Sequence, residues 1–216
     1  MSFITLVRHG QANSTAKDEE SYDRLSDLGW QQARWLGAYF HDAGDRFAHA
    51  WSGTLRRQIE TAQAAGFPDA QRDERLNEIA YFTLANLLEA QHGIAMPNDH
   101  ESYITHIPVL LRYWQEGRIE DAPESFAEFE KRTSDVLQEL AAGKGRALVV
   151  TSAVVIGMAM RVVMRLDINA LAHASLIIEN SSLHRIQPLS TGLAFSQFNA
   201  IPHMDSPERQ NSRSHV

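Results

Sequence analysis

The feature that most constrains the fold is the apolar run at the start of the chain. Residues Phe3 to Val7 are β-branched or apolar, without the alternation of a half-exposed strand, and Gly10 follows closely. Such a run is typical of a central strand that helices cover on both faces. A helix is expected from about Leu28 to Phe40, after the capping residue Ser26, and a second strand from Ala48 to Ser52. This alternation predicts an α/β fold, a three-layer α/β/α sandwich with a mostly parallel central sheet.

The same alternation continues through the rest of the chain. We expect helices from Thr54 onwards, over Phe126–Leu140 and over Val154–Met164, and strands at Ala147–Thr151, Ser175–Ile178, Ser182–Ile186 and Leu193–Phe198. On the first of these helices, the spacing of Leu55, Ile59 and Ala62 predicts the buried face. Pro123 suits the first turn of the helix that follows it.

No break in composition divides the chain, so residues 1–204 are expected to form a single domain. Residues 79–122 show no regular period and are expected to be irregular and partly helical, with breaks at Pro97 and Pro108. This segment is expected to cap one end of the sheet. Residues 205–216 are polar, which predicts a flexible tail.

Composition excludes several classes of protein. The 216 residues include 20 Lys and Arg against 27 Asp and Glu, and this net charge of −7 argues against a nucleic-acid partner. The absence of cysteine excludes thiol nucleophiles, disulfides and thiolate metal sites. The longest uncharged run, Ala147 to Met160, is shorter than the roughly 20 residues of a membrane span, and the first residues lack signal-peptide features. We therefore expect a cytoplasmic protein without a membrane partner, and the sequence is compatible with a homodimer.

Polar residues follow three of the expected strands. They are Arg8 to Gln11, Ser52 to Arg57, and Thr151 to Ala153. Because the carboxyl ends of parallel strands meet at one edge of a sheet, these residues are expected to lie close together. A neutral imidazole is a nucleophile toward phosphorus, and a neighbouring guanidinium neutralises phosphoryl oxygens. Arg8 and His9 therefore suit phosphoryl transfer, and the alternative is an edge histidine beside a salt-bridged arginine.

Six segments, in their order along the chain, resemble the motifs of the histidine phosphatase superfamily, which includes the cofactor-dependent phosphoglycerate mutases. They are Leu6–Gln11, Leu25–Ala33, Ser52–Ala62, Leu76–Glu78, Asn180–Ser182 and Phe198–His203. Each segment alone is a weak signal, whereas the ordered set is specific and spans residues 3 to about 203. The resemblance implies a phosphoglycerate mutase-like fold.

The resemblance also implies a two-step phosphoryl transfer through a phosphohistidine. His9 would attack phosphorus, and Arg8 and Arg57 would clamp the oxygens of the transferred group. Glu78 would protonate the leaving oxygen and later deprotonate a water molecule. Composition alone favours a different interpretation of Glu78, as a solvated carboxylate on a loop.

The implied ligand is a small phosphorylated substrate, to which Gln11 and Asn13 would donate hydrogen bonds; Asn13 equally suits the cap of a turn. Arg56 is expected to be a surface charge or a substrate contact. No metal or other cofactor is implied, because the guanidinium groups neutralise the charge. The remaining histidines of interest have no metal-ligand spacing and are expected to be solvated or packed; they are His92, His100, His106, His184 and His203.

One position departs from the pattern that the resemblance implies. Ser152 and Ala153 stand where a second histidine followed by glycine is expected. A serine offers one neutral donor in place of a charge-capable one, which costs about two to three decades of rate. Its place at a helix N-terminus still favours an anion, so phosphate binding is expected to survive better than turnover. A weakened hold on the phosphoryl group favours hydrolysis of a phosphomonoester over a mutase reaction. The alternative is a catalytically impaired pseudo-phosphatase that binds a phosphorylated ligand or protein.

Overall fold

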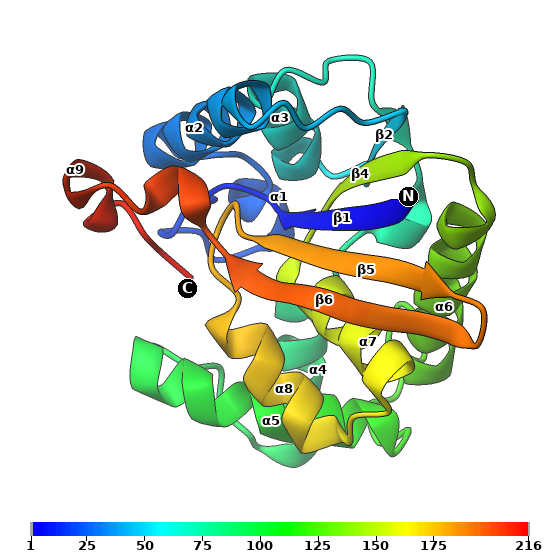
Figure 1. Ribbon diagram of the computed structural model, residues 1–216. Coiled ribbons are helices and arrows are strands. Elements are labelled where there is room, and N and C mark those ends of the chain that lie inside the picture. Colours follow the sequence, from blue (N-terminus) through cyan, green and yellow to red (C-terminus); the bar gives the residue numbers. More distant parts are fainter. Residues whose placement is uncertain (1, 216) are drawn as a thin grey trace.

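The computed structural model describes residues 2–215, which form a central six-stranded sheet between layers of helices (Figure 1). The strands are β1 (Phe3–Arg8), β2 (His49–Ser52), β3 (Gln71–Arg72), β4 (Arg146–Thr151), β5 (Leu183–Leu189) and β6 (Gly192–Ala200). Their spatial order is β3-β2-β4-β1-β5-β6. The first four strands pair in parallel, and β5 and β6 are antiparallel to their neighbours. The sheet is thus mixed and mostly parallel, as the sequence predicted.

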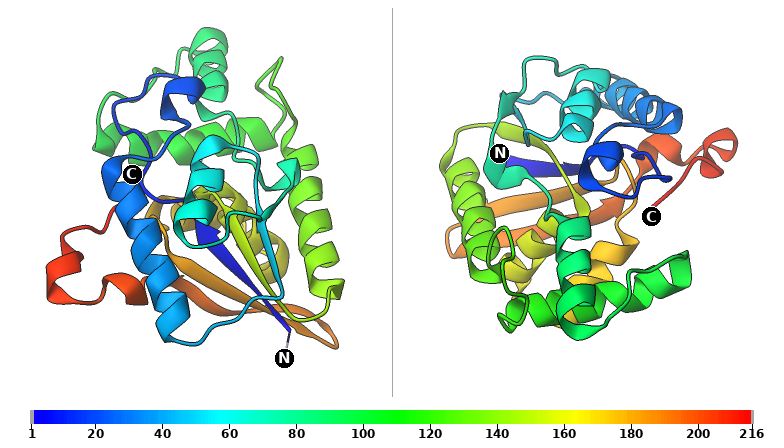
Figure 2. Two further views of the ribbon diagram at one scale, coloured as in Figure 1. Left: turned by 90° about the horizontal axis from the view of Figure 1, so that it is seen from above. Right: turned by 180° about the vertical axis from the view of Figure 1, so that it is seen from behind.

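Helices cover both faces of the sheet. They are α1 (Glu19–Tyr22), α2 (Asp27–Asp42), α3 (Arg56–Ala64), α4 (Tyr81–His92), α5 (His100–Gln115), α6 (Phe126–Ala142), α7 (Ala153–Met164), α8 (Ile168–Ile177) and α9 (Pro207–Gln210), with short 3₁₀ turns η1 (Glu74–Leu76) and η2 (Pro202–Met204). Figure 2 shows α2 and α6 on opposite sides of the strands. Along β1, Val7 belongs to a core cluster with Leu36 of α2, whereas Leu6 belongs to another with Ile156 of α7. Successive side chains of a strand point to opposite faces, so β1 is buried on both, which confirms the three-layer prediction.

Residues 79–122 are more regular than their sequence predicted, because they form α4 and α5. Gly93 ends α4 with a left-handed conformation (φ of +69°), and Asp99 begins α5 with a capping box. Pro108 lies inside α5 instead of breaking it. The apolar faces of both helices enter one large core cluster with α7 and α8. This burial stabilises helices whose own sequence periodicity is weak.

Two other local predictions are wrong. Ser175–Ile178 is not a strand, because residues up to Ile177 belong to α8, where the Ser175 hydroxyl donates to the Leu171 carbonyl. A short apolar run does not distinguish a buried strand from a buried helix, and tertiary packing decides between them. Pro123 does not lie in the first turn of α6, which begins at Phe126 after the cap Ser125.

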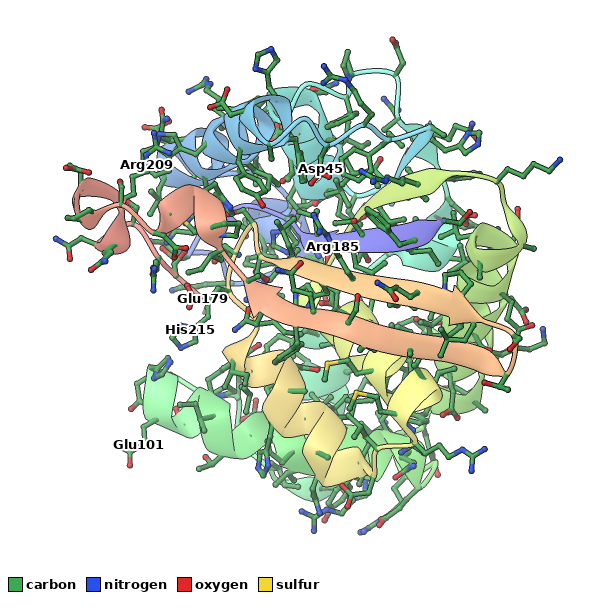
Figure 3. All side chains as sticks on the ribbon, in the orientation of Figure 1. Asp45, Glu101, Glu179, Arg185, Arg209 and His215 are labelled. Carbon is green, nitrogen blue, oxygen red and sulfur yellow. The ribbon has the colours of Figure 1, made fainter. Side chains whose placement is uncertain are left out.

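The polar C-terminal segment folds back onto the molecule. After α9, the Ser214 carbonyl accepts a hydrogen bond from the Asn180 backbone N–H, and Gln32 of α2 donates to the Ser212 carbonyl. His215 lies near the start of α5, with its ring 5.7 Å from that of His100 (Figure 3). Backbone and hydroxyl groups of Ser212 and Ser214 thus have partners on the protein. The flexible tail that polarity predicts for residues 205–216 stays a prediction, and residue 216 lies outside the described residues.

Two features are absent from the described part of the chain. Over residues 2–215, no helix combines the length and apolar character that crossing a membrane requires. The same residues contain no group of three or more His, Cys, Asp or Glu arranged to hold a metal ion.

Candidate active site

His9 lies directly after β1 and is almost completely buried, with 2% of its surface exposed. Its backbone N–H donates to the Thr151 carbonyl, which ties it to the end of β4. Gly10 allows this segment to pass close to α2, because a Cβ at Gly10 would lie 2.5 Å from the Gly29 carbonyl oxygen. The strand end and this close packing together fix the position of the imidazole.

The His9 ring is held in the form that a nucleophile requires. Nδ1 lies 2.7 Å from the Gly10 carbonyl oxygen, and because a carbonyl only accepts, Nδ1 carries the proton. Nε2 therefore keeps its lone pair. Burial, then the charges of Arg57 and Arg8, hold the pKa of His9 well below its ordinary value of 6.5. The imidazole is therefore neutral at neutral pH.

Arg57 is brought to His9 by the start of α3. Its Nε lies 3.3 Å from His9 Nε2, and 5% of the residue is exposed. Asp23 holds this end of the helix, because its carboxylate accepts hydrogen bonds from the Arg57 guanidinium (2.9 Å) and from the backbone N–H groups of Arg56 and Arg57. The guanidinium carbon also lies 4.9 Å from the centre of the Tyr22 ring. The choice of Arg57 over Arg56 thus agrees with the geometry, since the Arg56 side chain is 68% exposed and pairs with Glu60.

The predicted apolar face of α3 is confirmed only at Ala62, which is buried in the core. Leu55 and Ile59 are only partly buried, whereas four of the buried residues are polar. These four are Arg57, Gln58, Glu60 and Thr61. The helix turns its polar side inward because each of these side chains finds a partner at the ends of the strands or in the adjacent loop.

Arg8, the last residue of β1, supplies the second guanidinium. Its Nη1 donates to the backbone carbonyls of Ile178 and His215. No carboxylate within residues 2–215 forms an ion pair with Arg8, and its buried Nε has no partner there. Arg8 therefore forms no close ion pair with a described carboxylate, which suits an anion site.

Glu78 follows η1 and lies at the start of α7. One carboxylate oxygen accepts from the Val154 backbone N–H and the other from that of Ile79, each at 3.0 Å. Removal from water raises the pKa of Glu78, although these hydrogen bonds and the charges of Arg57 and Arg8 oppose the rise. Glu78 also lines an open cavity of about 660 Å³ with Asn77, Leu84, Trp114 and Arg132 among its walls.

Ser152 and Ala153 lie at the junction of β4 and α7, and both are buried. Arg8 pairs with Thr151 in the parallel register of β1 and β4, so the next residues, His9 and Ser152, leave the sheet side by side. The Ser152 hydroxyl does not cap α7 and instead accepts a hydrogen bond from the Gln58 amide at 2.9 Å.

Gln11 and Asn13 form their side-chain hydrogen bonds with Ser26, Ser21 and Thr15. The side-chain amide oxygen Oε1 of Gln11 accepts a hydrogen bond from the Ser26 hydroxyl at 2.8 Å. The Asn13 amide donates to the Ser21 carbonyl, and its oxygen accepts from Thr15. Asn13 thus caps a turn, which is the alternative that the sequence left open, and neither side chain has a hydrogen bond to His9.

The segment after α8 supports the backbone of His9. The Asn180 side chain donates to the His9 carbonyl at 3.2 Å, and the Ser181 backbone N–H donates to the carbonyls of Arg8 and His9. Ser181 adopts a left-handed φ of +59°, which aims its N–H at this strand end. Two nearby histidines are buried and neutral, because burial lowers the pKa of His184 to about 3 and that of His203 to about 4.

Sequence reasoning missed Asp23, Tyr22 and Gln58. Each contacts Arg57 or Ser152 across at least 34 positions of sequence, and local periodicity carries no signal for such contacts. Asp is a common helix-capping residue, but Asp23 caps α3 from a separate loop.

Comparison with known proteins shows which family the chain belongs to. The pattern of the histidine phosphatase superfamily (branch 1) matches residues 4–201. The chain belongs to the histidine phosphatase superfamily. No curated protein matches it.

Solved structures share the fold. A mutant phosphoserine phosphatase from Entamoeba histolytica, in complex with phosphoserine, is 19% identical with a TM-score of 0.70, and the match covers 94% of this chain and 100% of that one. YhfR of Bacillus stearothermophilus is 19% identical, with a TM-score of 0.69 and coverage of 94% and 99%. A phosphoglycerate mutase from Bacillus anthracis is 17% identical, with a TM-score of 0.65 and coverage of 94% of each chain. The fold is therefore phosphoglycerate mutase-like.

Proposed function

We propose that the protein hydrolyses a small phosphomonoester through a phosphohistidine at His9. The observation that carries this proposal is the contact between the Arg57 guanidinium and Nε2 of a neutral, buried imidazole. A phosphoryl group bonded to Nε2 would lie next to the Arg57 guanidinium, which could donate hydrogen bonds to its oxygens. Arg8, without a carboxylate partner within residues 2–215, would supply the second charge.

In the first step, the lone pair of His9 Nε2 forms a bond to phosphorus as the bond from phosphorus to the ester oxygen breaks. The leaving oxygen takes a proton from Glu78, whose raised pKa keeps a larger fraction protonated near neutral pH. The charge on the phosphoryl oxygens is stabilised by Arg8 and Arg57 throughout.

In the second step, the Glu78 carboxylate takes a proton from a water molecule. The resulting hydroxide attacks phosphorus, the bond to Nε2 breaks, and inorganic phosphate leaves with Glu78 protonated again. Glu78 thus serves as the acid of one step and the base of the next.

Hydrolysis is favoured over a mutase reaction by the chemistry of Ser152. A mutase must retain the phosphoryl group and present it to a second oxygen, which requires a strong hold on the phosphoryl oxygens. Ser152 can offer the phosphoryl oxygens a neutral hydroxyl but no positive charge. The phosphoryl group is therefore expected to be lost to water.

The experiment is a turnover assay on a panel of phosphomonoesters, including p-nitrophenyl phosphate, phosphoserine and 3-phosphoglycerate. We expect release of inorganic phosphate from at least one of them, with loss of more than about a thousand-fold in kcat for His9→Ala. Unchanged turnover in His9→Ala would refute the mechanism.

The same neutral Ser152 favours a second candidate function, binding of a phosphorylated ligand without turnover. Calorimetry with inorganic phosphate and phosphoserine distinguishes the two. Binding that Arg8→Ala abolishes, combined with no phosphate release from any ester of the panel, would favour this second function.

A further inference from the structure

Gln58 is a completely buried polar residue on α3 that the mechanism above does not use. Its amide nitrogen donates to the Ser152 hydroxyl oxygen at 2.9 Å and to the Leu76 carbonyl at 3.0 Å. Gln58 therefore connects the helix that carries Arg57 to the end of β4 and to the segment just before Glu78.

The surroundings fix which way the Gln58 amide faces. The Leu76 carbonyl only accepts hydrogen bonds, so the side of the amide that faces it must be the NH₂ group. The amide oxygen lies beside Gly53, where a Cβ would come within 1.8 Å of it. The amide is thus packed in one orientation, with its donor toward Ser152.

This orientation determines the role of the Ser152 hydroxyl. A serine hydroxyl has one proton and two lone pairs, and here a lone pair accepts from Gln58. Within residues 2–215, no hydrogen bond uses the hydroxyl proton, and the hydroxyl does not cap α7. The proton is free to be donated to a ligand.

The position of Ser152 indicates that ligand. His9 and Ser152 leave the sheet side by side after the paired residues Arg8 and Thr151. We propose that Gln58 is a positioning residue, which orients the Ser152 hydroxyl so that it donates to an oxygen of the phosphoryl group on His9. This inference rests on the proposed phosphoryl transfer, and it makes Ser152 a donor in place of a charged group.

A double-mutant cycle tests the inference. Ser152→Ala removes the donor, and Gln58→Met keeps the shape of the side chain but removes the group that orients it. We expect each single variant to lower kcat about ten-fold with KM changed less than about two-fold, the range for a hydrogen bond to a charged group. In the Ser152→Ala background, Gln58→Met should then change kcat less than about two-fold, because its action passes through the hydroxyl.

Gln63, an exposed glutamine on the same helix, provides the matched control, and Gln63→Met should leave kcat unchanged. Equal losses from Gln58→Met in both backgrounds would overturn the inference, since Gln58 would then act independently of Ser152. If Gln58→Met does not fold, the kcat values of Ser152→Thr and Ser152→Ala test the inference instead. The threonine variant should keep most of kcat, and wild-type kcat in Ser152→Ala would overturn the inference. His9→Ala, measured in the same assay, tests the proposed function separately.

Discussion

The two sides of the site offer different chemistry to a phosphoryl group. At the end of β1 and the start of α3, the buried Arg57 guanidinium contacts the His9 imidazole, and the buried Arg8 adds a second positive charge that acts on it. At the end of β4 and the start of α7, Ser152 is neutral, and the Val154 N–H is already bonded to Glu78. In the proposed reaction, the charged side would bind the phosphoryl group and carry the nucleophile, and the neutral side would limit how strongly the transition state is held. The predictions below test this difference.

The largest effect is expected on the charged side, from Arg57→Ala. Removing a guanidinium that contacts the reacting nitrogen should lower kcat roughly 100- to 1,000-fold. Arg56→Ala is the matched control, because the exposed Arg56 side chain pairs with Glu60, and its loss should change kcat less than about three-fold. Thermal melting of each variant shows that it is folded. Similar losses in both variants would contradict the assignment of the charged side.

Next in size is the loss of the proton donor in Glu78→Gln. For an alkyl phosphate, whose leaving oxygen needs a proton, kcat should fall about 100-fold. For p-nitrophenyl phosphate, whose leaving group departs as an anion, the first step needs no proton and should be far less affected. Glu89→Gln, a change at an exposed glutamate on α4 that does not line the cavity beside Glu78, serves as the control. An equal loss of phosphorylation rate on both substrates would argue against Glu78 as the acid.

The pH dependence of the rate tests the protonation states of His9 and of Glu78. Because the pKa of His9 is lowered, the imidazole remains neutral below pH 6.5, and kcat/KM should persist below that pH. Because the pKa of Glu78 is raised, its acid form is lost at a higher pH than for an ordinary carboxylate. Rates with an alkyl phosphate should therefore fall as pH rises through that raised value, and Glu78→Gln should remove this limb. An acid limb at the ordinary histidine pKa would contradict the description of His9.

A charged donor on the neutral side should give a smaller effect, in the opposite direction. Ser152→His with Ala153→Gly is expected to raise kcat about ten-fold or more while changing KM less. The structure adds a steric requirement, because the Gln58 amide lies 2.9 Å from Ser152, so Gln58→Ala should be included to make room. If the triple variant folds and gains nothing over a wild type that already turns over rapidly, the neutral side is not limiting.

The smallest effect is expected from deleting residues 211–216. The His215 carbonyl accepts from Arg8, and Ser214 bonds to Asn180, which in turn bonds to the His9 carbonyl. Loss of these hydrogen bonds should lower kcat/KM by about three- to ten-fold, since each contributes about 1 kcal/mol. Steady-state kinetics of the truncated chain measure this effect. A truncated protein with unchanged kcat/KM and unchanged Tm would show that the segment does not support Arg8.

The sequence predicted the parts of the fold that carry a strong local pattern. The predicted bounds of β1, β4, α2, α6 and α7 lie within a few residues of those in the structure. Apolar runs and helical periodicity can be recognised from the local sequence alone. The helices α4, α5 and α8 were not, since they are stabilised by packing against one another in a single cluster. Tertiary burial there outweighs a weak local pattern.

The candidate site was likewise predicted only in part. His9 and Ser152 were expected together because both follow parallel strands, and β1 and β4 do pair in that register. The inward turn of α3 was not expected, because Leu55 and Ile59 suggested an apolar face. Asp23 and Gln58 were missed because their partners lie far away in the sequence, and only the folded chain brings them into contact.

The most direct test of the account is to trap the covalent intermediate. Wild-type protein should be mixed with a radiolabelled phosphomonoester, quenched, and digested for peptide mapping. We expect an acid-labile, base-stable label on the peptide that contains His9, and no label in His9→Ala. A label on another residue, or full turnover by His9→Ala, would contradict the central claim that His9 carries the phosphoryl group.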